Sequence, residues 1–592
     1  MNYKLIFERF LLWRSKHLSH KYYVLFLSVV VGLLSGTAAL IIKNLVFFIQ
    51  WILTSGFAKD YHNYLYFAYP FIGLLITVYF VKKVVRQPVS HGIPNTLYAI
   101  SKRNSNIRRH NIFSSIITSA LTVGFGGSCG LEGPTVVTSA AWSSNLGRAL
   151  NLNYKTKTLL IGCAAAGSMA SLFNAPIAAI VFAIEVFMLD LTMSSMIPLL
   201  LASASAAITS RLFLGDEVLF HVKIYDAFSI QHVFYYVLLG IFCGLLSAYF
   251  SKVYFLISQF FERLKASYPK AILGGILLGI IVFVLPPLYG EGYDTINALI
   301  NGKPLKLLET SLFYEYKNDF WVLTGFLLAV ILFKAIATTI TFGSGGVGGI
   351  FAPSLFVGSV AGYLFSRMIN YIEFSKLSYT NFTLAGMGGF MAGVLHSPLT
   401  AIFLIAEITG GYDLFIPLMI TASIAYLTAK YFNNHSVYTM QLAKRGELIT
   451  HDKDRAILTL MQLKTVIEND FVSVHIEGKL SDVVKAIQQS NRNIFPVLDD
   501  NKKFYGFVLL DDIRNIMFKK ELHDIITVLD VLTVSPAEIS SKDSMDIVMR
   551  KFEETEAWNL PVIDHGIYVG FVSKSKLFSA YRNLLMEFYN EG

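Results

Sequence analysis

Two apolar segments of this chain repeat each other, and each is interrupted by a proline that a straight membrane helix would not need. Residues 174–185 and 396–407 match position for position, and in both copies the proline precedes a glutamate by nine residues. Upstream of each copy lies a glycine loop that ends in proline, at residues 127–134 and 343–353. Discontinuous apolar helices in two corresponding halves are typical of transporters, whose site lies where the halves meet. The repeat therefore predicts a polytopic, all-α membrane body with unwound backbone around a protected cavity.

The composition agrees with this prediction and locates the part of the chain outside the lipid. Of the 592 residues, 54% are hydrophobic and 15% are charged, against about 25% charged in a soluble domain. Residues 451–592 hold 17 basic and 22 acidic residues, which leaves 32 basic and 18 acidic residues before them. We interpret the excess of basic residues before residue 451 as a sign of membrane topology, because basic residues concentrate at cytoplasmic membrane edges. The lipid bilayer is then the expected partner of this part, and nucleic-acid binding is not expected. The three cysteines have no zinc or disulfide spacing, so no metal site is expected.

The glycine loops have a composition suited to anions. Glycine lets backbone approach a ligand, and proline is favoured in a first helical turn. The free N–H groups and partial positive charge of a helix start attract an anion without holding it as tightly as a lysine would. A third loop, residues 90–94, has the same design. Within the second loop stands Glu132, a carboxylate among apolar neighbours. We interpret Glu132 as a gate that competes with the anion until it is protonated or rotates away.

These residues resemble the signatures of the chloride channel (CLC) family of anion channels and proton-coupled antiporters. Residues 90–94 resemble the family's GSGIP motif, residues 130–134 its GxEGP motif and residues 349–353 its GxFxP motif. Tyr438 stands where the family places the tyrosine that points at the central anion. The resemblance implies an inverted repeat of broken, tilted helices, chloride as the bound substrate, a homodimer and a multi-pass location in the cell membrane.

The resemblance also assigns roles residue by residue. It makes Glu132 the gating glutamate. The anion-binding positions that it implies are Ser90, His91, Gly130, Leu131, Gly133, Ile350, Phe351 and Tyr438.

Two departures from the family pattern affect the expected mechanism. His91 stands where the family usually has a serine, and an imidazole donates one hydrogen bond when neutral and adds charge when protonated. Val186 occupies the position at which typical antiporters carry a second, proton-transferring glutamate. Because valine cannot relay a proton, we expect channel-like or weakly coupled chloride conduction. A proton-coupled chloride antiporter remains the alternative, with His91 or Glu185 as the substitute proton carrier.

The acidic tail contains a second repeat of strand, turn and strand, residues 495–508 and 560–572. It resembles the tandem CBS pair that the family often carries on the cytoplasmic side, a small α/β region that in many proteins binds adenine nucleotides. Here each nucleotide half-motif is incomplete: Asp512 is present in the first copy and Ser573 in the second. We expect a scaffold for dimerisation or gating with no required cofactor, and a nucleotide bound through Asp512 and Ser573 as the alternative.

The expected organisation is a transport domain over residues 1–446, with halves at roughly 22–212 and 228–446, followed by CBS modules at 447–518 and 519–592. The basic N-terminus and the tail are placed in the cytoplasm. A remote alternative is an intramembrane serine hydrolase, because residues 126–130 match GxSxG around Ser128 and His396 is a conceivable base. We expect no enzyme, because the glycine-serine start recurs at residue 343 without a catalytic need. A CBS-gated cation transporter would need acidic or carbonyl ligands where these loops offer helix starts.

Overall fold

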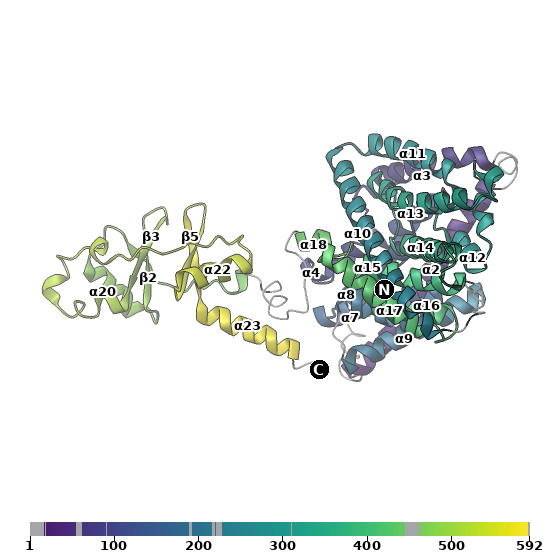
Figure 1. Cartoon of the computed structure of the whole chain (residues 1–592). Helices are drawn as coiled ribbons and strands as arrows, with labels where there is room; N and C mark the ends of the chain where they lie inside the picture. The colour runs from purple at the N-terminus through teal and green to yellow at the C-terminus, as the bar shows by residue number, and fades with distance from the viewer. Residues whose placement is uncertain are drawn as a thin grey trace, which may run out of the picture. The chain divides into compact units, whose positions relative to one another are not determined.

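A computed structural model describes residues 17, 19–54, 62–89, 92–188, 192–215, 220, 226, 228–309, 311–444, 461 and 463–589. The chain divides into two compact units, Met1–Leu448 and Ile449–Gly592. The first is helical and the second contains the strands (Figure 1). The fold class expected from the sequence, an all-α membrane body followed by a small α/β region, is confirmed.

The first unit consists of two successive sets of helices with the same order of long and short members. The first set comprises α2 (His20–Thr54), α3 (His62–Phe80), α4 (Ile93–Lys102), α5 (Asn111–Gly124), α6 (Glu132–Ala149), α7 (Tyr154–Phe173), α8 (Pro176–Phe187) and α9 (Met193–Leu214). The second comprises α10 (Val233–Arg263), α11 (Ser267–Val284), α12 (Tyr293–Ile300), α13 (Phe320–Gly343), α14 (Phe351–Tyr371), α15 (Tyr379–Leu395), α16 (Pro398–Ile408) and α17 (Phe415–Phe432). Short turns η2 (Val81–Val85), η3 (Ile230–His232), η4 (Pro286–Leu288), η5 (Pro304–Leu308) and η6 (Tyr314–Tyr316) and the helix α18 (Met440–Lys444) complete the unit.

Packing follows the repeat. Helix α2 contacts α7 and α9, as α10 contacts α15 and α17. Corresponding helices also meet across the two sets, because α3 packs on α11 (Figure 1) and α8 packs on α16. Among the described residues, eight helices are long and apolar enough to cross a membrane. Others, such as α8 and α16 with 12 and 11 residues, are too short to do so.

The residues at the breaks explain why the helices stop where they do. Helices α7 and α15 end at Asn174 and His396, which have φ of 54° and 55° and so leave the right-handed helix. Two residues later Pro176 and Pro398 begin α8 and α16, at the position where the missing N–H of proline costs nothing. The same local chemistry therefore produces the same bend in both halves.

The second unit contains two small antiparallel β-hairpins. Its elements are η7 (Leu463–Thr465), β1 (Val474–His475), α20 (Leu480–Gln489), β2 (Ile494–Leu498), β3 (Phe504–Leu509), α21 (Leu510–Ile513), η8 (Lys520–Leu522), η9 (Val528–Val531), α22 (Met545–Thr555), β4 (Asn559–Asp564), β5 (Ile567–Ser573) and α23 (Lys574–Tyr589). Strand β2 pairs with β3 and, in parallel, with β1, while β4 pairs with β5. The ring of Phe571 is fully buried and joins the hairpins by packing on Phe471, Phe504 and Phe507.

Candidate functional site

The two glycine loops meet at the centre of the first unit. The N–H of Gly130 donates to the carbonyl of Gly349 over 2.9 Å, and the N–H of Gly349 donates to the carbonyl of Gly130 over 2.7 Å. A Cβ at Gly349 would lie 2.8 Å from the nitrogen of Gly133, so a larger residue would separate the loops. Glycine at this position is therefore required by the close approach of two backbones.

Three helix starts converge at this contact. Helices α6 and α14 begin directly after the paired loops, and Pro134 and Pro353 lie in their first turns. Helix α4 begins after Gly92, whose φ is 60°. A Cβ placed on Gly92 would lie 3.3 Å from the Cα of Gly133. The partial positive ends of α4, α6 and α14 thus point toward one small region, as expected of a site for an anion.

Glu132 lies at this convergence and is almost completely buried, with 1% of its surface exposed. Its Oε1 accepts a hydrogen bond of 2.7 Å from the hydroxyl of Tyr293. Its Oε2 has no hydrogen-bond partner in the described part of the chain. A Cβ at Gly130 would overlap this oxygen, and one at Gly349 would lie 3.0 Å from it. The carboxylate therefore rests in the space that the glycines leave beside the helix starts.

The structure describes only some of the other predicted anion-binding residues. Tyr438 is 3% exposed, and its hydroxyl has no hydrogen-bond partner among the described residues. The charge of Glu132 acts on Tyr438 electrostatically. A buried hydroxyl without a partner costs about 1–3 kcal/mol, so this group is available to donate to an anion. Ile350 and Phe351 are buried at the start of α14, whereas Ser90 and His91 lie outside the described residues.

Two amides predicted to face an anion have protein acceptors instead. The N–H of Gly130 is used in the contact with Gly349. The N–H of Leu131 donates to Oε1 of Glu291 over 3.3 Å. In this structure the Gly130 amide therefore pairs the two loops and the Leu131 amide is occupied by Glu291, so the anion-binding roles of both stay predictions. The sequence did not indicate this, because the acceptors lie 219 and 160 residues away.

The glutamates of the apolar repeat form reciprocal caps. Glu185, near the end of α8, accepts hydrogen bonds from the N–H groups of Leu399 (3.1 Å) and Thr400 (2.8 Å) at the start of α16. The hydroxyl of Thr400 also donates to it, over 2.6 Å. Each carboxylate oxygen of Glu185 is thus occupied. The neighbouring Val186 is buried, with 5% of its surface exposed.

Glu407, near the end of α16, does the same for the start of α8. It accepts hydrogen bonds from the N–H groups of Ile177 (3.0 Å) and Ala178 (2.8 Å). Each copy of the repeat therefore caps the other copy's helix, where a negative charge is stabilised by the helix dipole. Spacing alone could not reveal that the glutamates cross between the halves.

A segment that the sequence interpretation missed reaches Glu132. Gly290, Glu291 and Gly292 lie between η4 and α12, which begins at Tyr293. Glu291 and Tyr293 contact the start of α6. The carbonyl of Gly290 accepts a hydrogen bond of 3.2 Å from Lys334, whose side chain is fully buried. The signal was present: Glu291 stands between two glycines in an apolar region, much as Glu132 stands before Gly133.

The hydrolase alternative is not supported by the geometry. The hydroxyl of Ser128 is buried and has no hydrogen-bond partner in the described ranges. The ring of His396 instead packs against the ring of Tyr426, with 5.5 Å between their centres. The serine and its conceivable base are therefore not brought together as a nucleophile and base must be.

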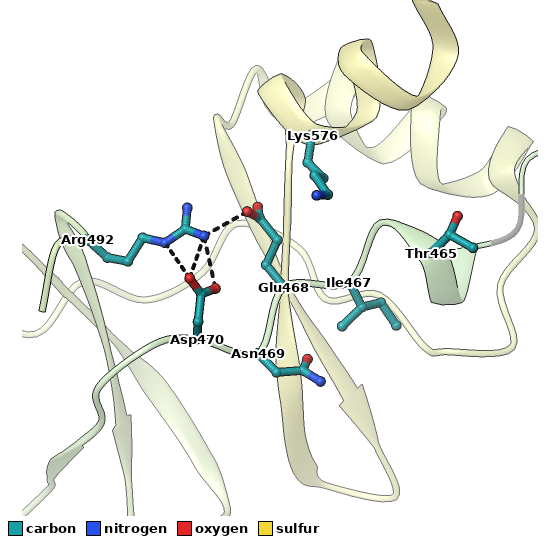
Figure 2. A pocket seen from close by; sticks show the side chains of 7 residues that line it. All are labelled: Thr465, Ile467, Glu468, Asn469, Asp470, Arg492 and Lys576. Atoms are coloured by element: carbon teal, nitrogen blue, oxygen red, sulfur yellow. Dashed lines mark hydrogen bonds and ion pairs between the residues drawn. The ribbon is translucent and has the colours of Figure 1, made fainter. Parts of the chain in front are cut away.

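The second unit contains a cavity of about 550 Å³ lined by charged side chains. Figure 2 shows Arg492 facing Glu468 and Asp470, with ion pairs of 2.9 and 2.8 Å, and Lys576 nearby. The hydroxyl of Ser573 donates to Glu468 over 2.7 Å. Arg492 and the hydroxyl of Ser573, the kinds of group that bind a phosphate, are thus already bonded to the carboxylates of Glu468 and Asp470.

The two residues predicted for a nucleotide do not share this cavity. Ser573 bonds to one of its lining residues, whereas Asp512 is exposed and accepts a hydrogen bond of 3.1 Å from the hydroxyl of Thr533. The scaffold role and the nucleotide role therefore both stay predictions.

Paired halves, converging helix starts and a buried carboxylate between them define a membrane transport protein of the CLC type. The chain belongs to the voltage gated chloride channel family, whose profile matches residues 72–430. A CBS domain matches residues 463–519. The family and the tail predicted from the motifs are confirmed, and CLC-type chloride transport is the function class of the chain.

The relatives include both kinds of CLC protein. A putative chloride channel protein ClcB-like from Ralstonia nicotianae is 30% identical over 343 residues, covering 56% of this chain and 74% of the relative. The H(+)/Cl(-) exchange transporter ClcA of Vibrio cholerae is 27% identical to this chain. The match covers 71% of this chain and 89% of the transporter. The crystal structure of a slow cyanobacterial Cl-/H+ antiporter has the same fold, with a TM-score of 0.61 and 22% sequence identity. The match covers 72% of this chain and 98% of the antiporter chain.

Proposed function

We propose that this protein conducts chloride in a channel-like or weakly proton-coupled manner, with Glu132 as the protonatable gate. The observation that carries the proposal is the position of Glu132. Its carboxylate is buried beside the starts of α6 and α14, where an anion would be held, and one of its oxygens has no partner among the described residues. Tyr438, with its buried hydroxyl, is the second anion ligand in this proposal, and Ile350 and Phe351 supply the backbone of the central site.

The geometry around Val186 supports weak coupling. A proton carrier must be free to gain and lose a proton, and valine has no group that can do so. The adjacent Glu185 holds three hydrogen bonds at the start of α16, so it is committed to the fold. Neither residue offers a free carboxylate at the position where an internal proton-transfer group would stand.

A proton-coupled antiporter is the second candidate. What favours it is that the Vibrio cholerae relative, matched over 89% of its length, is named an exchange transporter. His91 is the proton carrier in that case.

The wider assembly belongs to the same proposal. It comprises a homodimer with one pathway per subunit, in the cell membrane, with the N-terminus and the tail in the cytoplasm. The basic residues before the first apolar run support this orientation. We retain residues 1–446 as the transport domain and 447–518 and 519–592 as the CBS modules, the latter acting in dimerisation or gating without a required nucleotide.

Replacement of Glu132 tests the proposal. Glu132→Gln keeps the size of the side chain and removes its charge, so it should raise chloride conduction in liposomes at neutral pH and weaken the pH dependence. Glu132→Ala should do the same by emptying the position. If both variants fold but stay closed and keep the wild-type pH response, Glu132 is not the gate.

A further inference from the structure

A second carboxylate lies next to the gate. Glu291 occupies the connection between η4 and α12, and its neighbours Gly290 and Gly292 have φ of 63° and 87°. These left-handed glycines turn the chain sharply on both sides of Glu291. A Cβ on Gly292 would overlap the ring of Phe356, so the close packing of this turn also requires glycine. The connection is therefore shaped to present the side chain of Glu291 at one place.

The side chain of Glu291 lies at the start of α6, the helix that begins at Glu132. Oε1 of Glu291 accepts the hydrogen bond from the N–H of Leu131, the residue directly before Glu132. Two residues further along the chain, Tyr293 at the start of α12 donates to Glu132 itself. The Leu131 amide lies at the start of α6, one of the three converging helix starts, and the carboxylate of Glu291 occupies it. An anion can use that donor only after Glu291 has left it.

Charged groups on three other elements act on Glu291 electrostatically. They are Glu132 of α6, Lys334 of α13 and Lys43 of α2. Lys334 is tied to the same connection through Gly290 and lies over the ring of Phe356, with 4.6 Å from its Nζ to the ring centre. Lys43 also donates to the carbonyl of Leu172 over 3.4 Å. The two lysines stabilise the negative charge of the half-buried Glu291, while Glu132 opposes it.

We propose that Glu291 is a second gating carboxylate, which blocks the anion site at the converging helix starts while it is charged and held on the Leu131 amide. Like Glu132, it occupies an anion donor and repels an approaching anion. Protonation removes its charge, weakens its hold on the amide and lowers the repulsion between the two carboxylates. The pathway then opens in response to two protonatable groups. This inference rests on the proposed function and adds a second gate to it.

Two substitutions separate a gate from a structural cap. Glu291→Gln keeps a carbonyl acceptor for Leu131 and removes the charge, so a purely structural residue would tolerate it. If Glu291 is a gating residue, the loss of its negative charge should raise chloride flux at pH 7 on the order of tenfold, because a charge of the same sign as the anion is removed. Glu291→Ala removes both the charge and the cap and should raise flux at least as much. Asp294→Asn, an exposed carboxylate in α12, is the matched control and should leave flux unchanged.

The pH profile gives an independent measurement. In purified full-length protein in liposomes, flux is followed from pH 5 to pH 8 for Glu132→Ala alone and for Glu132→Ala with Glu291→Gln. We expect the single variant to keep a residual pH dependence and the double variant to lose it. Identical profiles for these two variants, or wild-type flux in a folded Glu291→Gln protein, overturn the second gate.

Failure of the proposed function looks different. If the wild-type protein passes no chloride at any pH, the proposed function itself fails. If the wild-type protein passes chloride and responds to Glu132→Ala but not to Glu291→Gln, only the second gate fails. Elution as a single species in size-exclusion chromatography confirms that each variant is folded before its flux is interpreted.

Discussion

The hydrogen bond from Tyr293 to Glu132 allows the gate to be perturbed by one atom. Tyr293→Phe removes the hydroxyl that donates to Oε1 of Glu132 over 2.7 Å and leaves the ring, which packs edge-on against Phe220 with 5.5 Å between centres. In the variant, Oε1 of Glu132 loses the hydroxyl that donates to it. Oε2 already has no partner within the described residues, so neither oxygen then accepts a hydrogen bond from a side chain.

The magnitude follows from the chemistry of that bond. A hydrogen bond to a charged group contributes about 1.5–3 kcal/mol net. Loss of about 1.5 kcal/mol shifts the equilibrium from the carboxylate in its present position toward the displaced carboxylate by about tenfold, since 1.36 kcal/mol corresponds to a factor of ten. Chloride flux at neutral pH should rise by up to that factor. Activation by acid should also require less acid, because the bond stabilises the charged carboxylate and the variant lacks it.

The assay is chloride efflux from liposomes that hold purified wild-type or variant protein. Tyr289→Phe is the matched control, since its hydroxyl donates to the carbonyl of Gly124 over 3.3 Å and not to the gate. A double-mutant cycle adds specificity: the effect of Tyr293→Phe should vanish in the Glu132→Ala background. Unchanged flux in Tyr293→Phe, or an equal rise in that background, would refute the role of this hydrogen bond.

Two further predictions concern the fold. Glu185→Ala and Glu407→Ala should each destabilise the protein by about 2 kcal/mol, because each leaves two helix-start N–H groups without an acceptor; thermal unfolding in detergent measures this, and equal stability of wild type and variants would contradict the capping role. In the tail, hydrogen bonds from Arg492 hold the pKa of Asp470 below its usual value, so the pair stabilises the unit above about pH 4 and this contribution is lost as the pH falls further. Because Asp470 is mostly exposed, the effect should stay under about 1 kcal/mol; hydrogen exchange over residues 463–589 of the full chain should show an acid-induced loss of protection that Asp470→Asn lacks.

Much of the architecture could be predicted because it rests on local chemistry. Glycine followed by proline specifies a helix start, and the apolar repeat specifies that the same bend occurs twice. These features predicted the convergence of the loops before Glu132 and Phe351. The strand and turn pattern of the tail likewise predicted the two strand pairs, β2 with β3 and β4 with β5.

What the sequence did not show are the partners chosen in three dimensions. Nothing local indicates that Glu185 caps α16 or that Glu291 takes the amide of Leu131, because such contacts depend on how the halves meet. The hydroxyl of Tyr293 was overlooked for the same reason. The predicted ligands Ser90 and His91 lie outside the described residues, so their roles stay predictions.

The most direct test of the central claim measures two ions at once. Purified protein in liposomes is given an outward chloride gradient, and chloride efflux is recorded together with the internal pH. We predict chloride flux that Glu132→Gln increases, with little or no proton movement against its own gradient, as expected if Val186 cannot relay protons and Glu132 acts as a gate. Strong uphill proton movement driven by chloride would contradict the channel-like account and establish an antiporter.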